Sequence, residues 1–178
     1  MTFDFARAWE VLVLFLIPVG GGIPAGVVLA QRYGFAWEMM AILYFVSDVI
    51  LACVFEPLMI LFVRASRRSP RWAKVREALA RSTGQTISRY GIKPGPFTLV
   101  WITFGTDPMT GRSVAFAAGH GFLTGWALTI AGDMLFFLVL MASTLWLNNV
   151  LGNGTVAALV ITVAMMAIPP LVRRLRRR

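Results

Sequence analysis

The residues best suited to chemistry in this chain are a few charged side chains inside long apolar stretches. Of its 178 residues, 58% are hydrophobic and 8 are acidic. Asp48 and Asp133 each fall near the middle of an apolar run, and Glu56 follows Asp48 by about two helical turns, on nearly the same face. Ionisable groups at membrane depth are rare, face the protein interior and mark ion or proton paths. The two aspartates are therefore candidate proton carriers, with a structural carboxyl bonded to nearby backbone as the alternative.

A second group of candidates lies in the polar segment Ile102–Arg112. Asp107 and Arg112 are five residues apart there, across Pro108 and Gly111. The two charges could pair with each other, or Arg112 could bind an anionic substrate group, since a guanidinium suits bidentate recognition of phosphate or carboxylate. The glycines would let backbone N–H groups approach an anion, and a half-helix starting here would add its dipole. The threonines could line a polar path or satisfy broken backbone.

An earlier apolar segment, 11–31, is also interrupted by prolines and glycines. A straight helix is not expected there, because proline removes a backbone donor and consecutive glycines weaken a helix. Such a break survives in lipid only inside protein or along a wet cavity, so we expect this segment to form a backbone wall facing the charged one. The full set of candidate substrate- or ion-binding residues is Asp107, Arg112, Asp133, Asp48, Glu56, Thr106, Thr110, Gly105, Gly111, Gly20, Gly22 and Gly26.

Motifs for catalysis, metal binding or nucleotide binding do not occur in the sequence. It has no Ser/His/Asp spacing, no cluster of metal-ligand residues, no P-loop and no dinucleotide fingerprint. The lone His120 is expected to be interfacial and the lone Cys53 to be a helix-packing residue. We therefore expect no enzymatic activity, no cofactor and no metal.

Basic residues outnumber acidic ones by 17 to 8, and they gather in the segment 64–93 and the tail 173–178. Because apolar runs adjoin both, the expected partners are anionic lipid headgroups at the cytoplasmic face rather than nucleic acid. Within 64–93, a short amphipathic helix on the membrane surface and a solvated linker are both compatible with the pattern.

The hydropathy pattern predicts an all-α integral membrane protein with a single membrane domain over residues 1–178. Pro57 is expected to kink or end the first spanning helix. Two segments, 11–31 and 94–118, are predicted to be re-entrant. The predicted spanning helices are, in order, 35–63, 119–147 and 155–172, with a turn over 148–154.

Charge asymmetry gives a topology. The basic linker 64–93 and the basic tail 173–178 should both face the cytoplasm. Three apolar segments lie between them, and three crossings would put the tail outside. One segment must therefore fail to cross, and 94–118 is the candidate because it is polar and broken. If 11–31 is also re-entrant, the N-terminus lies outside.

The chain also matches itself at an offset of 85 residues. Seven identities fall in this register, among them Gly26 with Gly111, Gly34 with Gly119 and Asp48 with Asp133. The predicted repeat units are 9–63 and 94–147, each a broken hairpin followed by a spanning helix. With the topology above, the two units are inverted, a plan that recurs in secondary transporters.

Short motifs in both broken segments resemble a known family. Gly22-Ile23-Pro24-Ala25-Gly26, Arg89-Tyr90-Gly91 and Pro108-Met109-Thr110-Gly111 are similar to segments of the putative small multi-drug export proteins, relatives of the DedA (SNARE-associated, VTT-domain) membrane proteins. The resemblance implies two opposed re-entrant hairpins and a transporter-like fold, and it suggests proton dependence and translocation of polyprenyl phosphates or phospholipids. The family often carries a glutamate and an arginine before its first Ile-Pro, where this chain has Val19-Gly20-Gly21-Gly22.

The expected function is therefore that of a small integral membrane transporter in the bacterial cytoplasmic (inner) membrane. It would couple export, or translocation of a lipid headgroup, to protons or ions at a site between the two hairpins. The alternatives are a non-transporting membrane scaffold or assembly factor, in which Gly119, Gly125 and Gly132 pack helices, and an ion channel. The expected partners are membrane lipids and a small-molecule, ion or headgroup substrate, and the chain could form a homodimer.

Overall fold

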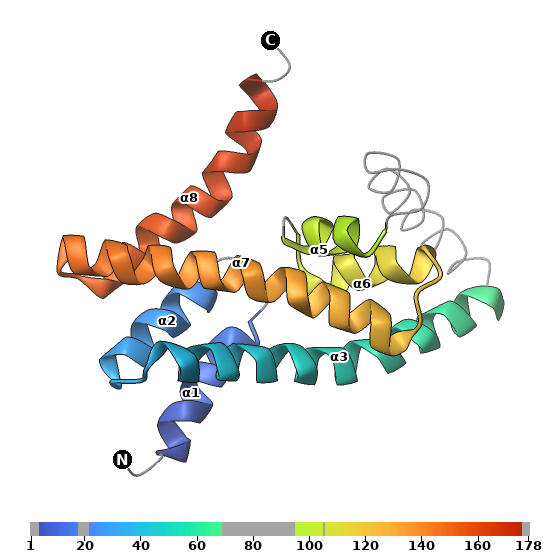
Figure 1. Cartoon of the computed structure of the whole chain (residues 1–178), viewed down its shortest axis with the longest axis horizontal. Coiled ribbons are helices and arrows are strands. Elements are labelled where there is room, and N and C mark those ends of the chain that lie inside the picture. Colours follow the sequence, from blue (N-terminus) through green and yellow to red (C-terminus); the bar gives the residue numbers. More distant parts are fainter. Residues whose placement is uncertain (1–3, 18–21, 69–94, 105, 176–178) are drawn as a thin grey trace. The chain divides into compact units, whose positions relative to one another are not determined.

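The computed structural model describes residues 4–17, 22–68, 95–104 and 106–175, and throughout these ranges its regular secondary structure is helical (Figure 1). The predicted all-α fold is confirmed for this part of the chain. The linker residues 69–93, the tail residues 176–178 and two candidate site residues, Gly20 and Gly105, lie outside the described residues. In chain order the helices are α1 (Phe5–Phe15), α2 (Gly22–Arg32), α3 (Trp37–Arg68), α5 (Pro96–Phe104), α6 (Pro108–Ala117), α7 (Phe122–Leu151) and α8 (Gly154–Leu175).

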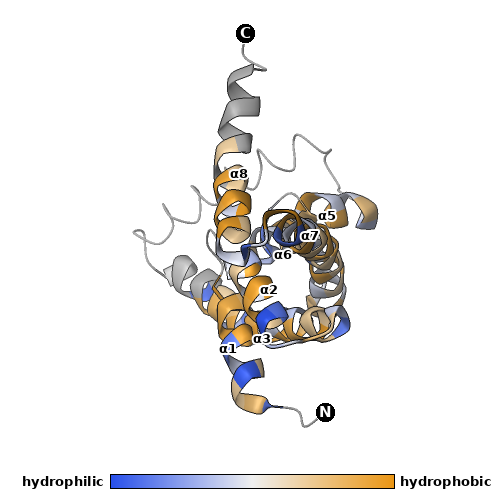
Figure 2. Ribbon diagram, turned by 90° about the vertical axis from the view of Figure 1, so that its left-hand side faces the viewer, coloured by the Kyte–Doolittle hydropathy of each residue, from blue (hydrophilic) through white to orange (hydrophobic). Residues whose placement is uncertain are grey.

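Two helices are long and apolar enough to cross a membrane, Trp37–Leu61 within α3 and Phe122–Leu151, which is α7. Only 33% and 44% of their most apolar windows are buried inside the protein, so most of their apolar surface faces outward. Leu58, Leu135 and Val139 are 50–57% exposed. Figure 2 shows the same hydrophobic character along α2 and the described part of α8. Apolar exposure on this scale marks an interaction surface for lipid or protein.

The helix boundaries correct two predictions. Pro57 was expected to kink or end the first long helix, and it does not end it, because α3 continues through it to Arg68. A proline is tolerated inside an apolar helix where neighbouring groups satisfy the freed carbonyl. The predicted turn over 148–154 begins too early, since α7 continues to Leu151 and the reversal is confined to Gly152 and Asn153. Gly152 has a φ of 64°, which favours glycine.

Both segments predicted to be broken consist of two short helices, α1 with α2 and α5 with α6. Their boundaries follow the offset of 85 residues: α2 and α6 both end, and α3 and α7 both begin, at equivalent positions. Gly34 and Gly119 are equivalent and have φ values of 74° and 86°. At both sites the residue after the glycine donates to a carbonyl five residues back, Phe35 to Ala30 at 3.0 Å and His120 to Ala115 at 2.9 Å. Both helices thus end in the same glycine-dependent cap.

The chain divides into two compact units, residues 1–47 with 137–178 and residues 48–136. In the first unit α1 packs on α2 and α2 packs on α8. Phe15, Tyr44 and Phe137 form its aromatic core, with the Tyr44 and Phe137 rings stacked at 4.1 Å. In the second unit α5 packs on α6, around Leu99, Ile102, Val114 and Ala115.

Polar side chains of the first unit gather in what we call the polar layer. The Tyr33 hydroxyl donates to the Glu10 carboxylate, which joins the end of α2 to α1. Two further bonds join the same end of α2 to the end of α7 and the start of α8: Asn148 Nδ2 donates to Gln31 Oε1 at 2.6 Å, and Arg32 Nη2 donates to Thr155 Oγ1 at 3.2 Å. The end of α2 therefore lies at this layer, beside the middle of α1.

Candidate functional site

The site in the second unit begins with α6, which is positioned by its own N-terminal cap. Asp107 accepts a hydrogen bond from the Thr110 backbone at 2.8 Å, and Pro108 opens the helix. Arg112 follows one turn later and is only 1% exposed. A buried guanidinium requires a charged partner, since desolvating it alone costs several kcal/mol.

That partner is Glu56 on α3. Arg112 Nε donates to Glu56 Oε2 at 2.9 Å and Arg112 Nη2 donates to Glu56 Oε1 at 2.7 Å. The Trp126 indole N–H, from α7, donates to Glu56 Oε2 at 2.9 Å. The prediction offered Asp107 or an anionic substrate as the partner of Arg112, and the structure assigns this position to Glu56. We call Glu56, Arg112 and Trp126 the clamp, because it joins three helices.

The remaining surroundings of the guanidinium are also filled. Arg112 Nη1 points at the His120 carbonyl at 3.4 Å, and the Phe116 ring lies 5.7 Å away in a cation–π arrangement. Gly125 provides the space, because a Cβ added there would lie 2.6 Å from Arg112 Nη1. The clamp is therefore a closed, internally satisfied ion pair.

Asp48 and Asp133 form the second polar cluster, the aspartate pair. Each is 3% exposed, and their side chains lie close enough to interact. Two carboxyl groups can form a hydrogen bond with each other only when one of them carries a proton. Asp48 Oδ2 is buried with no hydrogen-bond partner in the described chain. The pair thus combines two apposed carboxyls and one unsatisfied oxygen in an apolar stretch.

The two clusters fix the register of α3 against α7 within this unit. Asp48 meets Asp133, and Glu56, eight residues further on, meets Trp126, seven residues earlier. The helices are therefore antiparallel here, and the clusters lie about 12 Å apart along α3. Because Asp48 and Asp133 are equivalent at the offset of 85, two equivalent residues touch each other.

The other predicted site residues have local structural roles. Asp107 is exposed and caps α6, also accepting from Thr110 Oγ1 at 2.6 Å, so it belongs to neither cluster. Thr106 Oγ1 donates to the Ile102 carbonyl at 2.9 Å. Three buried glycines allow close packing: a Cβ would lie 2.5 Å from the Leu14 carbonyl oxygen at Gly22, 2.5 Å from the Phe15 ring at Gly26 and 2.4 Å from Thr103 Oγ1 at Gly111.

Sequence reasoning missed Trp126 and the role of Gly125. A signal for Trp126 was present, since it lies seven residues, about two turns, before Asp133 and therefore on a similar face of α7. Its partner Glu56 could not be identified without the register of α3. The described residues contain no group of three or more His, Cys, Asp or Glu side chains that could hold a metal ion.

The geometry distinguishes the two clusters. The aspartate pair brings together two acidic groups of a type that could exchange a proton, while the clamp holds α6 on α3 and α7 with its charges already neutralised. Comparison with protein-family models, curated proteins and solved structures finds no match to this chain.

Proposed function

We propose that this protein is a small integral membrane transporter, coupled to protons through the aspartate pair, in a bacterial cytoplasmic membrane. The observation that carries the proposal is the apposition of the buried Asp48 and Asp133 side chains, which lie in the two helices long enough to span a bilayer. Two unit negative charges 4 Å apart repel by about 4 kcal/mol even at an effective dielectric constant of 20. The pair is therefore expected to hold one proton, and a conformational change that separates the two carboxyls would release it.

Inverted repeats would provide that conformational change. The equivalent helix ends, the matched caps at Gly34 and Gly119 and the contact between equivalent aspartates all support an internal repeat. Two residues related by a two-fold axis meet where the axis passes between their helices, so the contact between equivalent residues on antiparallel helices favours inversion. Inverted repeats commonly place transport sites at their interface near the bilayer midplane.

The polar layer supports the re-entrant reading of the first hairpin. The bond from Tyr33 to Glu10 brings the end of α2 back to α1. If the layer lies at one membrane surface, α1 and α2 enter and return without crossing, whereas α3 and α8 lead away from it. The basic segment after α3 and the basic tail after α8 then share the opposite, cytoplasmic side, in accord with the positive-inside rule.

The clamp indicates which charge the substrate carries. Because Glu56 occupies both bidentate positions of Arg112, an anionic headgroup would have to displace a buried carboxylate. This favours a cation or proton-coupled solute at the pair over an anion at Arg112.

The proposal is tested in liposomes. Purified protein would be screened against ions, organic cations and labelled lipids across an imposed pH gradient. Asp48→Asn and Asp133→Asn should each abolish the pH-dependent transport. Asp107→Asn, which retains a capping side chain, serves as the matched carboxyl control and should transport normally. Transport by all three variants would exclude the pair as the coupling site.

A membrane scaffold is the second candidate, and tight packing favours it. In the second unit a Cβ at Gly132 would lie 2.4 Å from the Val100 carbonyl oxygen, and Thr103 and Thr129 have no exposed surface. Small residues that bring helices this close are typical of static helix interfaces. A scaffold predicts no transport in the panel, together with a stable complex that survives Asp48→Asn and is lost when the packing glycines are enlarged.

A further inference from the structure

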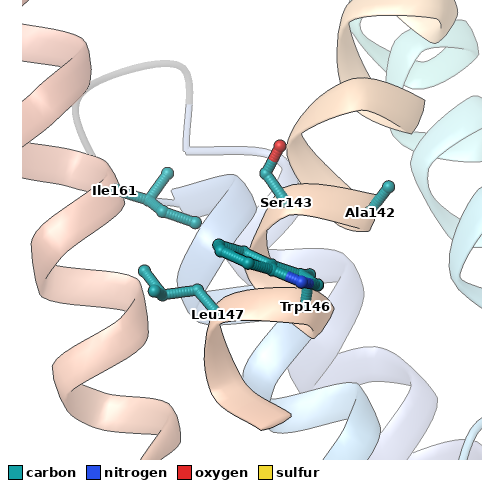
Figure 3. Close-up of a pocket in the computed structure, with 5 residues that line it drawn as sticks. All are labelled: Ala142, Ser143, Trp146, Leu147 and Ile161. Atoms are coloured by element: carbon teal, nitrogen blue, oxygen red, sulfur yellow. The ribbon is translucent and has the colours of Figure 1, made fainter. Parts of the chain in front are cut away.

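A groove between α7 and α8 in the first unit lies outside both polar clusters (Figure 3). It has a volume of about 460 Å³ and is lined by Ala142, Ser143, Trp146, Leu147 and Ile161. The only hydroxyl in this lining is already bonded, since Ser143 Oγ donates to the Val139 carbonyl at 2.7 Å. The Trp146 ring lies across the groove and is 65% exposed. This lining suits an apolar ligand of ordinary pocket size.

The groove starts close to the polar layer. On α7, Asn148 of the layer follows Trp146 by two residues, about 3 Å along the axis. On α8, Thr155 of the layer precedes Ile161 by six residues, about 9 Å. Tryptophan is enriched at this depth in membrane helices, where the indole meets both headgroups and chains. An occupant of the groove would therefore have its polar end at the layer.

A positive charge marks that end. Arg32 is exposed and donates to the neutral hydroxyl of Thr155, and no carboxylate of the described chain forms an ion pair with it. Two nearby charged groups already have partners: Arg7, whose guanidinium lies 5.4 Å from the centre of the Tyr33 ring, pairs with Asp4 at 3.0 Å, and Glu10 accepts from Tyr33. Among the described residues of the layer, Arg32 is thus a cation without a carboxylate partner, and it can bind an anion from outside the chain.

We propose that this groove binds a phospholipid, with an acyl chain along α7 and α8 and the phosphate on Arg32. The apolar lining matches the acyl chain, and the Arg32 guanidinium matches the phosphate. The polar layer beside the groove matches the boundary between the chain and the headgroup. Basic residues at groove ends between membrane helices are a recurring way to hold lipid headgroups. The site does not depend on transport through the aspartate pair.

Quenching of tryptophan emission by brominated phospholipids tests the proposal. Trp146 is 65% exposed, and Trp101, on α5 in the other unit, is 66% exposed and serves as the matched control. Subtracting the emission of Trp146→Phe from that of the wild type gives the Trp146 component, and the same subtraction with Trp101→Phe gives the Trp101 component. We expect the Trp146 component to be quenched at a roughly fivefold lower mole fraction of brominated phosphatidylglycerol than of brominated phosphatidylcholine, the effect of one basic residue at an anionic surface. The Trp101 component should respond equally to both.

Two variants locate the contacts. Arg32→Gln should remove the headgroup preference at Trp146, and Ala142→Leu, which narrows the groove, should raise the lipid fraction needed for quenching there. Circular dichroism identifies any variant that has lost its helices, and the Trp101 component confirms that vesicle insertion is unchanged. An equal response of Trp146 to both headgroups, or a preference that survives Arg32→Gln, would overturn the proposal. A Trp146 component that no lipid quenches would show that protein, such as a second copy of the chain, covers the groove.

Discussion

Removing one charge from the clamp should destabilise the protein far more than removing both. In Arg112→Met the Glu56 carboxylate stays buried with the Trp126 N–H as its remaining donor from the clamp. In Glu56→Gln the guanidinium loses two charged bonds of 2.7 and 2.9 Å while only 1% exposed. Breaking a buried pair in this way costs about 3–5 kcal/mol, whereas replacing both partners is often close to neutral. The double variant should therefore recover at least ~2 kcal/mol relative to the sum of the singles.

The assay is the free energy of unfolding in micelles, from denaturant titration followed by circular dichroism. Arg7→Met is the matched control, because Arg7 pairs with Asp4 at 3.0 Å with both side chains about half exposed. Such a surface pair contributes about 0–1 kcal/mol. Single clamp variants that behave like this control, or a double variant whose loss equals the sum of the singles, would refute the account of the clamp as a desolvated ion pair.

Three further predictions concern Gly125, Asp107 and Tyr33. Gly125→Ala places a Cβ 2.6 Å from Arg112 Nη1 and should cost about 1–3 kcal/mol, whereas Gly121→Ala, whose nearest atom is 3.8 Å away, should stay within about 0.5 kcal/mol in the same titration. Asp107→Ala should cost about 1 kcal/mol as a lost helix cap and Asp107→Asn almost nothing, so equal losses in thermal melts would argue against capping. The bond to Glu10 raises the pKa of the Tyr33 phenol above its ordinary value of 10.0, and Glu10→Gln should lower it in an ultraviolet titration referenced to Tyr33→Phe. Because folding favours the neutral phenol, the stabilisation from the Tyr33–Glu10 bond is complete below the phenol pKa of the unfolded chain and is lost as pH rises through the phenol pKa of the folded protein. A Tyr33 titration that is the same in Glu10→Gln and in the wild type would contradict this.

Much of the helical plan could be predicted, because it depends on local properties. Apolar length predicted α3, α7 and α8, and prolines and glycines predicted the breaks between α1 and α2 and between α5 and α6. The boundaries at Arg68 and Leu151 were missed. An apolar helix can continue through a proline where neighbouring groups satisfy the freed carbonyl, so Pro57 alone does not fix a helix end. The asparagines 148 and 149 fit inside the last turn of α7.

In the candidate site, too, some residues could be predicted from the sequence and others could not. Asp48 and Asp133 were singled out by charge within an apolar run and by the offset of 85, and both prove to be buried together. The partner of Arg112 was not predictable from nearby residues. Glu56 lies 56 residues earlier in the chain, and only the antiparallel register of α3 and α7 brings it beside Trp126 and the guanidinium. Asp107 was favoured for its charge, but its position before Pro108 already fitted a helix cap.

Transport as proposed requires the aspartate pair to exchange a proton as substrate moves. This exchange is measured as proton flux into liposomes, with an internal pH-sensitive dye, while a gradient of a transported solute is imposed. We expect flux with the wild-type protein and none with Asp48→Asn or Asp133→Asn, although both variants insert and remain helical. Solute transport by the wild-type protein without proton movement, or proton movement that persists in either variant, would contradict it.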